Sequence, residues 1–387
     1  MASPPPHAAA PIPDPDPPGS FLLATCQPGA EEVLAVRLAA ALPGSARGAW
    51  RRGVVSVRLP AAGELLDLDL LRGRVVFARA LVRCFGQAHW KGEGERSAAI
   101  RDRVPQARFD VIHCVPRDVR GIPAADVAAS PAAVAAATVL RQEFPEARLG
   151  PARPGEIVLD CVVDGPDRWW LGWHRATTPA TLHPGGYHPR ALPSQAVSRA
   201  WLKLDEAIAD FGIDIAPGSR VCEWGAAPGG ACQRLLEAGL EVVAVDPAPL
   251  DAVVALAPGF TQWRKRARDV ALRDMRGFRW LLSDMNIDPT STLEAVGRVA
   301  TAPGSTLEGL VLTLKIPDWS RAAALDEWLA AVRSWGFAPE ARQLSTGGRE
   351  VCVVARRRGP PRAARRRGGR QRSIRGRPRR ATRRAGR

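Results

Sequence analysis

The chain has 387 residues, more than one ordinary hydrophobic core accommodates, so two or three domains are expected. It carries 55 Lys and Arg against 39 Asp and Glu, but 16 of those basic residues are arginines between 356 and 387. The net charge of +16 therefore comes from this C-terminal stretch, and residues 1–355 are formally neutral.

Cysteine usage and hydropathy exclude several classes of protein. The seven cysteines are scattered and form no C-x-x-C pair, which argues against a disulfide framework and against a zinc site. The N-terminus has neither a basic start nor an apolar core, and no run approaches the roughly 18 apolar residues of a membrane span. These features predict a soluble protein of the reducing cytoplasm, with a monomer favoured.

The first half of the chain predicts an α+β region. Residues 1–20 hold eight prolines and predict a disordered leader. Strand and helix patterns over residues 21–88 predict one α+β unit, in which Glu31 and Glu32 suit a helix N-terminus. Residues 89–190 predict a second unit, with strands RFDVIHCV and EIVLDCVVDG around a helix that has Ser130 as N-cap. Its end, TTPATLHPGGYHPRALPSQ, predicts a linker or surface loop.

The pattern changes in the second half. From about residue 191 to 355, strands such as RVCEW and EVVAVD alternate with helices such as SRAWLKLDEAIADFG. Alternation of this kind predicts a mostly parallel sheet covered by helices on both faces, an α/β fold. Residues 356–387, rich in arginine and broken by Gly and Pro, predict a disordered tail.

A glycine-rich turn lies in the segment VCEWGAAPGGACQRLLEAG, residues 221–239. In doubly wound sheets, ligands bind where such a turn joins the first strand to a helix. Gly225, Gly229 and Gly230 allow a close approach of the backbone to a ligand, and Pro228 stiffens the turn. The turn matches neither the Walker pattern nor G-x-G-x-x-G, which excludes the first phosphate site and weakens the case for a dinucleotide. The alternative is a turn used only for packing.

Two acidic residues indicate the ligand. Asp246 closes the strand EVVAVD and can accept hydrogen bonds from two ribose hydroxyls, while Glu223, at the end of the first strand, can meet a cationic amine. A nucleoside that carries an amino acid fits this pair better than NAD does. The expected cofactor is S-adenosylmethionine.

Four charged residues fall at ends or edges of the predicted elements: Lys203, Asp284, Lys315 and Glu350. Taken singly, each fits a solvated charge, because charged residues are usually exposed. Together, the stretches SRAWLKLDEA, GAAPGG, SDM and LKIP, followed by a late strand beginning with Glu350, resemble the ribose 2′-O-methyltransferases of the FtsJ or RrmJ type. The resemblance covers about 160 residues and implies a Rossmann-like methyltransferase domain in which these four residues form a Lys-Asp-Lys-Glu catalytic tetrad.

The same resemblance implies the cofactor contacts. They would come from Glu223, Gly225, Ala227, Pro228, Gly229 and Gly230, with Asp246 on the ribose. Asp269 is the candidate for the adenine amino group, with Asp274 as its competitor, and Asp284 would touch cofactor and substrate. No metal is needed, because a sulfonium leaving group requires no Lewis acid and the six histidines show no ligand spacing.

The first half resembles a more specific family. Its opening LLATCQPGAEEVLA and the segment ending in WWLGWHR resemble the ferredoxin-like and THUMP-type RNA-binding portion of the RlmM-type bacterial 23S rRNA cytidine 2′-O-methyltransferases. This implies a cytidine of large-subunit ribosomal RNA as the substrate, before assembly is complete. The chain departs from that family at Glu223 and Trp224, where Asp and Leu are usual, and in its proline-rich leader and arginine tail.

The chemistry requires a base, because a ribose 2′-hydroxyl must lose its proton as it attacks the methyl group. Lys315 is the expected proton acceptor, Asp284 and Glu350 its orienting carboxylates, and Lys203 a positioning charge on the target nucleotide. Burial and Lys203 would lower the pKa of Lys315, whereas the two carboxylates would raise it. The sequence leaves that balance open.

Three segments are candidates for RNA contact: WRKRAR at 263–268, GWHR at 172–175 and HPGGYHPR at 183–190. For Trp169, Trp170 and Trp173, core packing is favoured over base stacking. The arginine tail would bind any polyanion by counterion release, or act only as a solubilising extension. Two other functions remain: methylation of another RNA or a small hydroxyl compound, and RNA binding by a relic methyltransferase fold.

Overall fold

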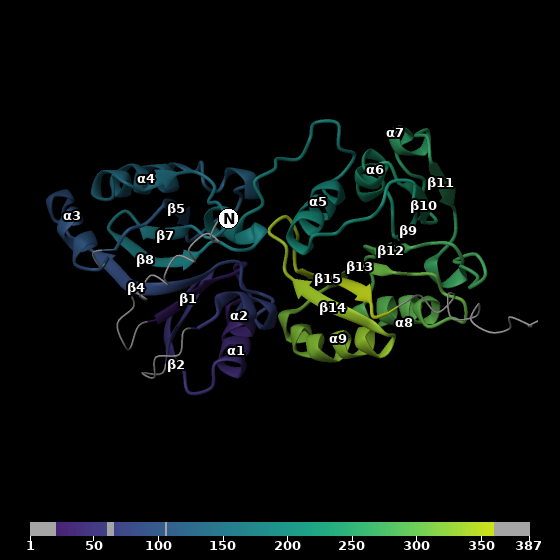
Figure 1. Cartoon of the computed structure of the whole chain (residues 1–387), viewed down its shortest axis with the longest axis horizontal. Helices are drawn as coiled ribbons and strands as arrows, with labels where there is room; N and C mark the ends of the chain where they lie inside the picture. Colours follow the sequence, from purple (N-terminus) through teal and green to yellow (C-terminus); the bar gives the residue numbers. More distant parts are fainter. Residues whose placement is uncertain (1–20, 60–65, 105–106, 360–387) are drawn as a thin grey trace, which may run out of the picture.

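The computed structural model describes residues 21–59, 66–104 and 107–359, which form two β-sheets with their covering helices (Figure 1). The first sheet comes from the N-terminal half and the second from the C-terminal half. The predicted leader and all of the predicted tail beyond residue 359 lie outside the described residues.

The first sheet has eight strands in the order β2-β3-β1-β4-β8-β7-β5-β6. Their bounds are β1 Phe21–Thr25, β2 Ala46–Arg51, β3 Val54–Arg58, β4 Leu81–His89, β5 Val111–Pro116, β6 Arg148–Leu149, β7 Ile157–Gly165 and β8 Arg168–Arg175. β4 ends the first predicted unit and pairs antiparallel with β8 of the second, from Arg83 opposite Trp173 to His89 opposite Arg168. The units predicted as 21–88 and 89–190 therefore share one continuous sheet.

Four helices accompany this sheet. They are α1 Glu31–Ala41, α2 Leu68–Arg74, α3 Glu93–Arg101 and α4 Pro131–Glu143. Ser130 stands at the N-cap position of α4, as predicted, but its hydroxyl donates to the Val127 carbonyl and does not accept from the helix. Trp169, Trp170 and Trp173 of β8 are all buried, so they pack in the core.

The second sheet has seven strands in the order β11-β10-β9-β12-β13-β15-β14. Their bounds are β9 Arg220–Trp224, β10 Glu241–Val245, β11 Phe260–Trp263, β12 Trp280–Ser283, β13 Gly309–Lys315, β14 Phe337–Arg342 and β15 Glu350–Arg357. Neighbours from β11 to β13 are parallel, and β15 runs antiparallel between β13 and β14. The strand order reverses at β9, which gives the doubly wound α/β arrangement that the alternating pattern predicts.

Helices cover both faces of this sheet. They are α5 Ala200–Phe211, α6 Gly230–Glu237, α7 Ala252–Ala255, α8 Pro289–Ala300 and α9 Leu325–Ser334. One buried cluster joins α5, α6 and α7 to side chains such as Val221, and another joins α8 and α9 to the opposite side of the strands, including Trp224. Central strands buried on both faces explain why these segments read as continuous apolar runs.

Two boundaries differ from the sequence-based expectation. Arg356 and Arg357 were expected in the disordered tail, but they are the last residues of β15, where Arg356 pairs with Gly309 and Ala338. The segment expected as a linker or surface loop is partly buried, because its own residues Tyr187 and His188 are each only 9% exposed.

The two sheets are joined by a continuous core. The cluster on the α8 and α9 face also contains Leu34 and Leu38 of α1, and Phe77 meets Trp319 edge-to-face with ring centroids 6.0 Å apart. The loop after β14 adds polar contacts, since the Gln343 amide donates to the Gln27 side chain at 2.6 Å. Within the described ranges, we find no helix with the length and apolarity needed to cross a membrane.

Candidate active site

The glycine turn connects β9 to α6 at the point where the strand order reverses. Gly225 has φ +76°, and a Cβ there would lie 2.9 Å from the Asp284 carbonyl oxygen and from the Met285 Cα. A Cβ on Gly230 would lie 2.8 Å from the Ser198 carbonyl oxygen. The turn is therefore packed between the end of β12 and the start of α5, with no room for side chains at either glycine.

A pocket of about 820 Å³ opens beside this turn. Its wall is formed by the glycine turn, the end of β10, the segment after β11, the loop after β12 and one side of α8. The residues of the wall are Gly225, Val245, Asp246, Pro247, Arg266, Ala267, Arg268, Met285, Asn286, Ile287, Ser291, Glu294, Ala295 and Arg298. The volume lies in the range of small-molecule sites, and the position is the one where doubly wound sheets bind ligands.

Asp246 is built into the pocket wall by backbone contacts. Its Oδ2 accepts from the Ala227 N–H at 3.1 Å and its Oδ1 from the Ala248 N–H at 2.8 Å. Each carboxylate oxygen keeps a further lone pair. A pair of vicinal hydroxyls could therefore bind this carboxylate without displacing the contacts that hold it.

Glu223, the residue expected to meet a cationic amine, lies near the end of β9 on the side that α6 covers. It is 2% exposed, and it lines a small cavity of about 30 Å³ that it shares with Lys203 and Asp284. The Cys232 thiol of α6 donates to its Oε2 at 2.8 Å. Side chains alternate along β9, and that of Glu223 points to the face of the sheet that α6 covers. It is not part of the wall of the larger pocket.

The two candidates for an adenine contact also lie off the pocket wall. Asp269 is exposed next to Arg268, and Asp274 pairs with Lys265 at 3.4 Å. The wall in this region is formed by Arg266, Ala267 and Arg268. The remaining predicted contacts belong to the turn itself, where Pro228 is exposed and Gly229, the N-cap of α6, packs against Val254.

Lys203, Asp284, Lys315 and Glu350 meet at the carboxyl edge of the sheet. The Lys315 ammonium donates to Asp284 Oδ1 at 2.6 Å and to Glu350 Oε2 at 2.8 Å, while Lys203 contacts Asp284 Oδ2 and lies 3.2 Å from Glu350 Oε1. Lys315 and Glu350 are direct partners in the β13–β15 register. Each ammonium thus bridges both carboxylates in a closed ring of four charges.

This ring is partly shielded from water, with side-chain exposures between 11% and 22%. Burial alone would raise the pKa of Asp284, but the two ammonium groups outweigh it and lower that pKa. Burial would likewise lower the pKa of Lys315, but Asp284 and Glu350 outweigh it, so that pKa is raised. The balance that the sequence left open therefore favours a protonated Lys315 in the free protein.

Two acidic residues that the sequence reasoning missed hold α5, and with it Lys203, in place. Asp205 accepts from Arg190 and Arg234 at 2.8 Å each and lies 3.1 Å from the His188 ring. Glu206 is 2% exposed and accepts from the Ser345 and Thr346 backbone N–H groups at 2.7 and 2.8 Å and from the Thr346 hydroxyl at 2.6 Å. Two consecutive acids on an otherwise apolar helix face are a sequence signal for such buried contacts.

The three predicted RNA-contact segments differ in exposure. In GWHR and HPGGYHPR, Trp173, His174, Tyr187 and His188 are buried, so these segments are mainly structural. In WRKRAR, Arg264, Arg266 and Arg268 are exposed, and two of them border the 820 Å³ pocket. An exposed basic surface therefore adjoins the pocket.

Glu223 predicts a pH dependence of stability. Burial, with a smaller contribution from Asp284, raises its pKa to about 8 from an ordinary 4.5. Between these values the folded state keeps a proton that the unfolded state has lost, so stability falls as pH rises, by up to about 1.4 kcal/mol per pH unit. Glu223→Gln should therefore lose less thermal stability than wild type between about pH 6 and 8.5, as measured by Tm.

The exposed Glu241, which lies 3.9 Å from Arg220, provides the matched control. Glu241→Gln should follow the wild-type pH profile. Parallel profiles for wild type and Glu223→Gln would show that the buried carboxyl is not protonated in the folded protein.

Comparisons with known proteins agree with this geometry. The FtsJ-like methyltransferase family model matches residues 196–313, a range that contains the glycine turn, Lys203 and Asp284. The Ribosomal RNA large subunit methyltransferase M of Halorhodospira halophila is 31% identical over 179 residues, which cover 45% of this chain and 51% of that protein. The protein of the same name from Azoarcus sp. is 30% identical over 201 residues, covering 48% of this chain and 51% of its own length.

The chain thus spans about half the length of these curated relatives in the matched regions. The matched family segment begins just before α5 and ends within β13, so it comprises the glycine turn and the pocket beside it. Residues 196–313 are therefore similar to the FtsJ-like methyltransferase family.

Proposed function

We propose that this protein transfers a methyl group from S-adenosylmethionine to the ribose 2′-hydroxyl of a cytidine in large-subunit (23S) ribosomal RNA. The observation that carries the proposal is the closed ring of Lys203, Asp284, Lys315 and Glu350 beside the glycine turn. The relatives' name supports a large-subunit RNA as the substrate.

The 820 Å³ pocket is the proposed cofactor site. Gly225 lets the turn pack closely against the backbone of Asp284 and Met285 at the pocket wall. Asp246 has lone pairs for two ribose hydroxyls, and Asp284 connects the loop after β12 to the ring of charges. When bound, the cofactor supplies an electrophilic methyl group. Glu223 lies beside the site as a buried neighbour of Asp284 and Lys203. The turn from Ala227 to Gly230 shapes the site through its backbone.

Lys315 is the proposed proton acceptor for the 2′-hydroxyl. It must first release the proton that Asp284 and Glu350 stabilise, and after the reaction the same carboxylates stabilise the ammonium that forms. Lys203 completes the charge balance of the ring and provides a cation beside the reacting groups. Placing the hydroxyl in line with the methyl group supplies much of the remaining rate enhancement.

The first sheet is the proposed THUMP-like RNA-binding region, with its ferredoxin-like part at β1 to β4. Arg266 and Arg268 of WRKRAR border the pocket and can contact RNA phosphates there. We place the reaction in the cytoplasm, where the ribosomal RNA substrate is made, with the protein acting as a monomer.

The experiment measures transfer of tritium from methyl-labelled S-adenosylmethionine to RNA. Protein-free 23S rRNA should be labelled, mature ribosomes should be labelled far less, and protein-free 16S rRNA serves as the matched control. Nuclease digestion should place the label in one nuclease-resistant dinucleotide that contains a 2′-O-methylcytidine. Equal labelling of both RNAs, or label on a base, would contradict the proposal.

A further inference from the structure

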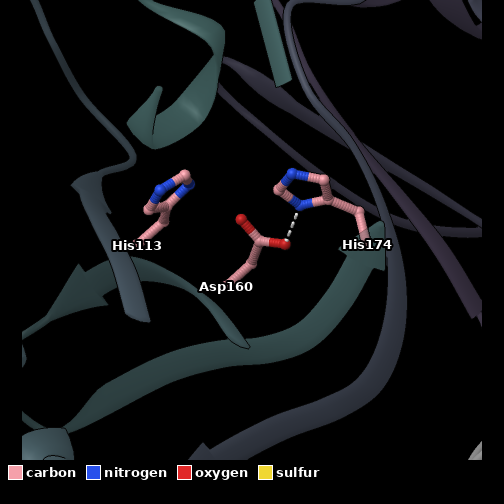
Figure 2. Close-up of side chains that lie close together, drawn as sticks. All are labelled: His113, Asp160 and His174. Atoms are coloured by element: carbon pink, nitrogen blue, oxygen red, sulfur yellow. Dashed lines mark hydrogen bonds and ion pairs between the residues drawn. The ribbon is translucent and has the colours of Figure 1, made fainter. Parts of the chain in front are cut away.

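Three buried side chains of the first sheet converge outside the proposed active site. His113 of β5 stands directly opposite Asp160 of β7, and His174 of β8 stands opposite Val158, two residues before Asp160. The three residues are 1%, 5% and 6% exposed. Figure 2 shows the Asp160 carboxylate between the two imidazole rings, and one ligand atom of each residue lies within 4.8 Å of the other two.

Backbone carbonyls fix the tautomer of both rings. The Nε2 of His113 lies 3.1 Å from the Gly150 oxygen, and the Nε2 of His174 lies 3.0 Å from the Thr181 oxygen. A carbonyl oxygen only accepts, so both Nε2 atoms carry hydrogen and both Nδ1 atoms are the ones available as ligands. Metal-binding histidines are held in this way, with the second ring nitrogen donating to a carbonyl or carboxylate.

The two Nδ1 atoms differ in what they contact. His174 Nδ1 lies 2.5 Å from Asp160 Oδ2, so a proton is shared between these two groups. His113 Nδ1 is buried and has no hydrogen-bond partner among the residues that the structure describes.

A buried lone pair beside a carboxylate is costly unless a donor or a cation lies between them. We propose that His113, Asp160 and His174 bind one zinc ion, with His113 Nδ1, His174 Nδ1 and an Asp160 oxygen as ligands. Two imidazoles and a carboxylate suit zinc and the later first-row metals. The metal replaces the proton shared by His174 and Asp160.

The required movement is small. Zinc bonds of about 2.0–2.2 Å place tetrahedral ligands about 3.4 Å apart, so separations of up to 4.8 Å must shorten by no more than about 1.4 Å, and His174 Nδ1 and Asp160 Oδ2, now 2.5 Å apart, must separate by about 0.9 Å. Rotations of the three side chains can supply this. Since the Nε2 atoms of His113 and His174 donate to the Gly150 and Thr181 carbonyls, a metal on the Nδ1 atoms would anchor both of these loops to the sheet.

The experiment uses the full chain without a histidine tag, stripped with EDTA and then exposed to one equivalent of zinc. Elemental analysis should find one zinc per chain after dialysis, and zinc should raise Tm. Cobalt(II) should give the visible absorption of a tetrahedral site. The competing arrangement is a hydrogen-bonded Asp160–His174 pair beside a metal-free His113. It predicts that no stoichiometric amount of zinc is retained after dialysis.

Variants locate the site. His113→Gln and Asp160→Asn should each weaken zinc binding at least about 100-fold, more than changes in the second shell of a metal site do. His89→Gln is the matched control, because His89 is an exposed histidine 3.6 Å from Asp167. Circular dichroism of the stripped proteins monitors folding.

The wild-type result is decisive even if a ligand variant misfolds. Less than one-tenth equivalent of zinc retained by folded wild type would overturn the proposal. So would unchanged affinity in folded His113→Gln.

Discussion

Replacing Lys315 by methionine should lower kcat for RNA methylation by about 10²- to 10⁴-fold, the usual contribution of a positioned base. Methionine keeps an unbranched side chain of similar length but removes the Nζ that contacts Asp284 and Glu350. The Kd for S-adenosylmethionine should change only a few-fold, because Lys315 does not line the 820 Å³ pocket. Single-turnover methyl transfer and equilibrium binding measure the two effects separately.

Lys315→Arg distinguishes a base from a structural charge. The guanidinium can keep both ion pairs but does not release its proton in the accessible pH range. If Lys315 accepts the proton, this variant should be almost as slow as Lys315→Met. Near wild-type activity in Lys315→Arg would assign the residue a purely electrostatic role.

The pH profile provides a second readout of the same role. Since the two carboxylates raise the pKa of Lys315 above its ordinary 10.5, the free amine is a small fraction at neutral pH. The single-turnover rate of wild type should therefore rise about tenfold per pH unit from about pH 7 to 9. The residual rate of Lys315→Met should lack this slope, and a flat wild-type profile would argue against a lysine base.

The sequence predicted the second sheet well because its strands are buried on both faces and alternate with amphipathic helices. Two of the four charges of the ring could be selected for the same reason. Lys315 ends one apolar strand and Asp284 follows another, at the edge of the sheet where ligands bind in such folds. Their contacts, in contrast, depend on a register between β13 and β15 that pairs Lys315 with Glu350. That register is a tertiary property and cannot be read from either strand alone.

Two residues show that the face an element presents depends on tertiary packing. Glu223 is expected to contact the cofactor's amine, and the structure adds that the strand continues through Trp224 and that its alternation turns the Glu223 side chain toward Cys232. The polar segment that contains His188 was expected at the surface. Its partner Asp205 lies on a helix 17 residues away, and only the packed structure shows that the two meet.

The first sheet was harder to divide, because its two halves have similar strand patterns. The sequence suggests separate units, whereas the pairing of β4 with β8 makes one sheet. The same pairing of distant strands gathers His113, Asp160 and His174, which have no metal-ligand spacing in the sequence. Clusters formed across strands in this way are found only from the structure.

Replacing Gly225 by alanine should weaken S-adenosylmethionine binding by about 10- to 100-fold. Two costs combine at this position, a left-handed φ of +76° and a Cβ only 2.9 Å from the backbone of Asp284 and Met285. Relief of that contact must move the turn or the end of β12, and both border the proposed cofactor pocket. Gly218 separates the two costs, because it also has φ +76° but nothing within 4 Å of its would-be Cβ. Gly218→Ala should show a similar backbone penalty in Tm yet bind the cofactor as wild type does, measured by calorimetry. Equal binding by Gly225→Ala and Gly218→Ala would mean that the cofactor does not depend on the close approach between the glycine turn and Asp284, and the pocket assignment would then be wrong.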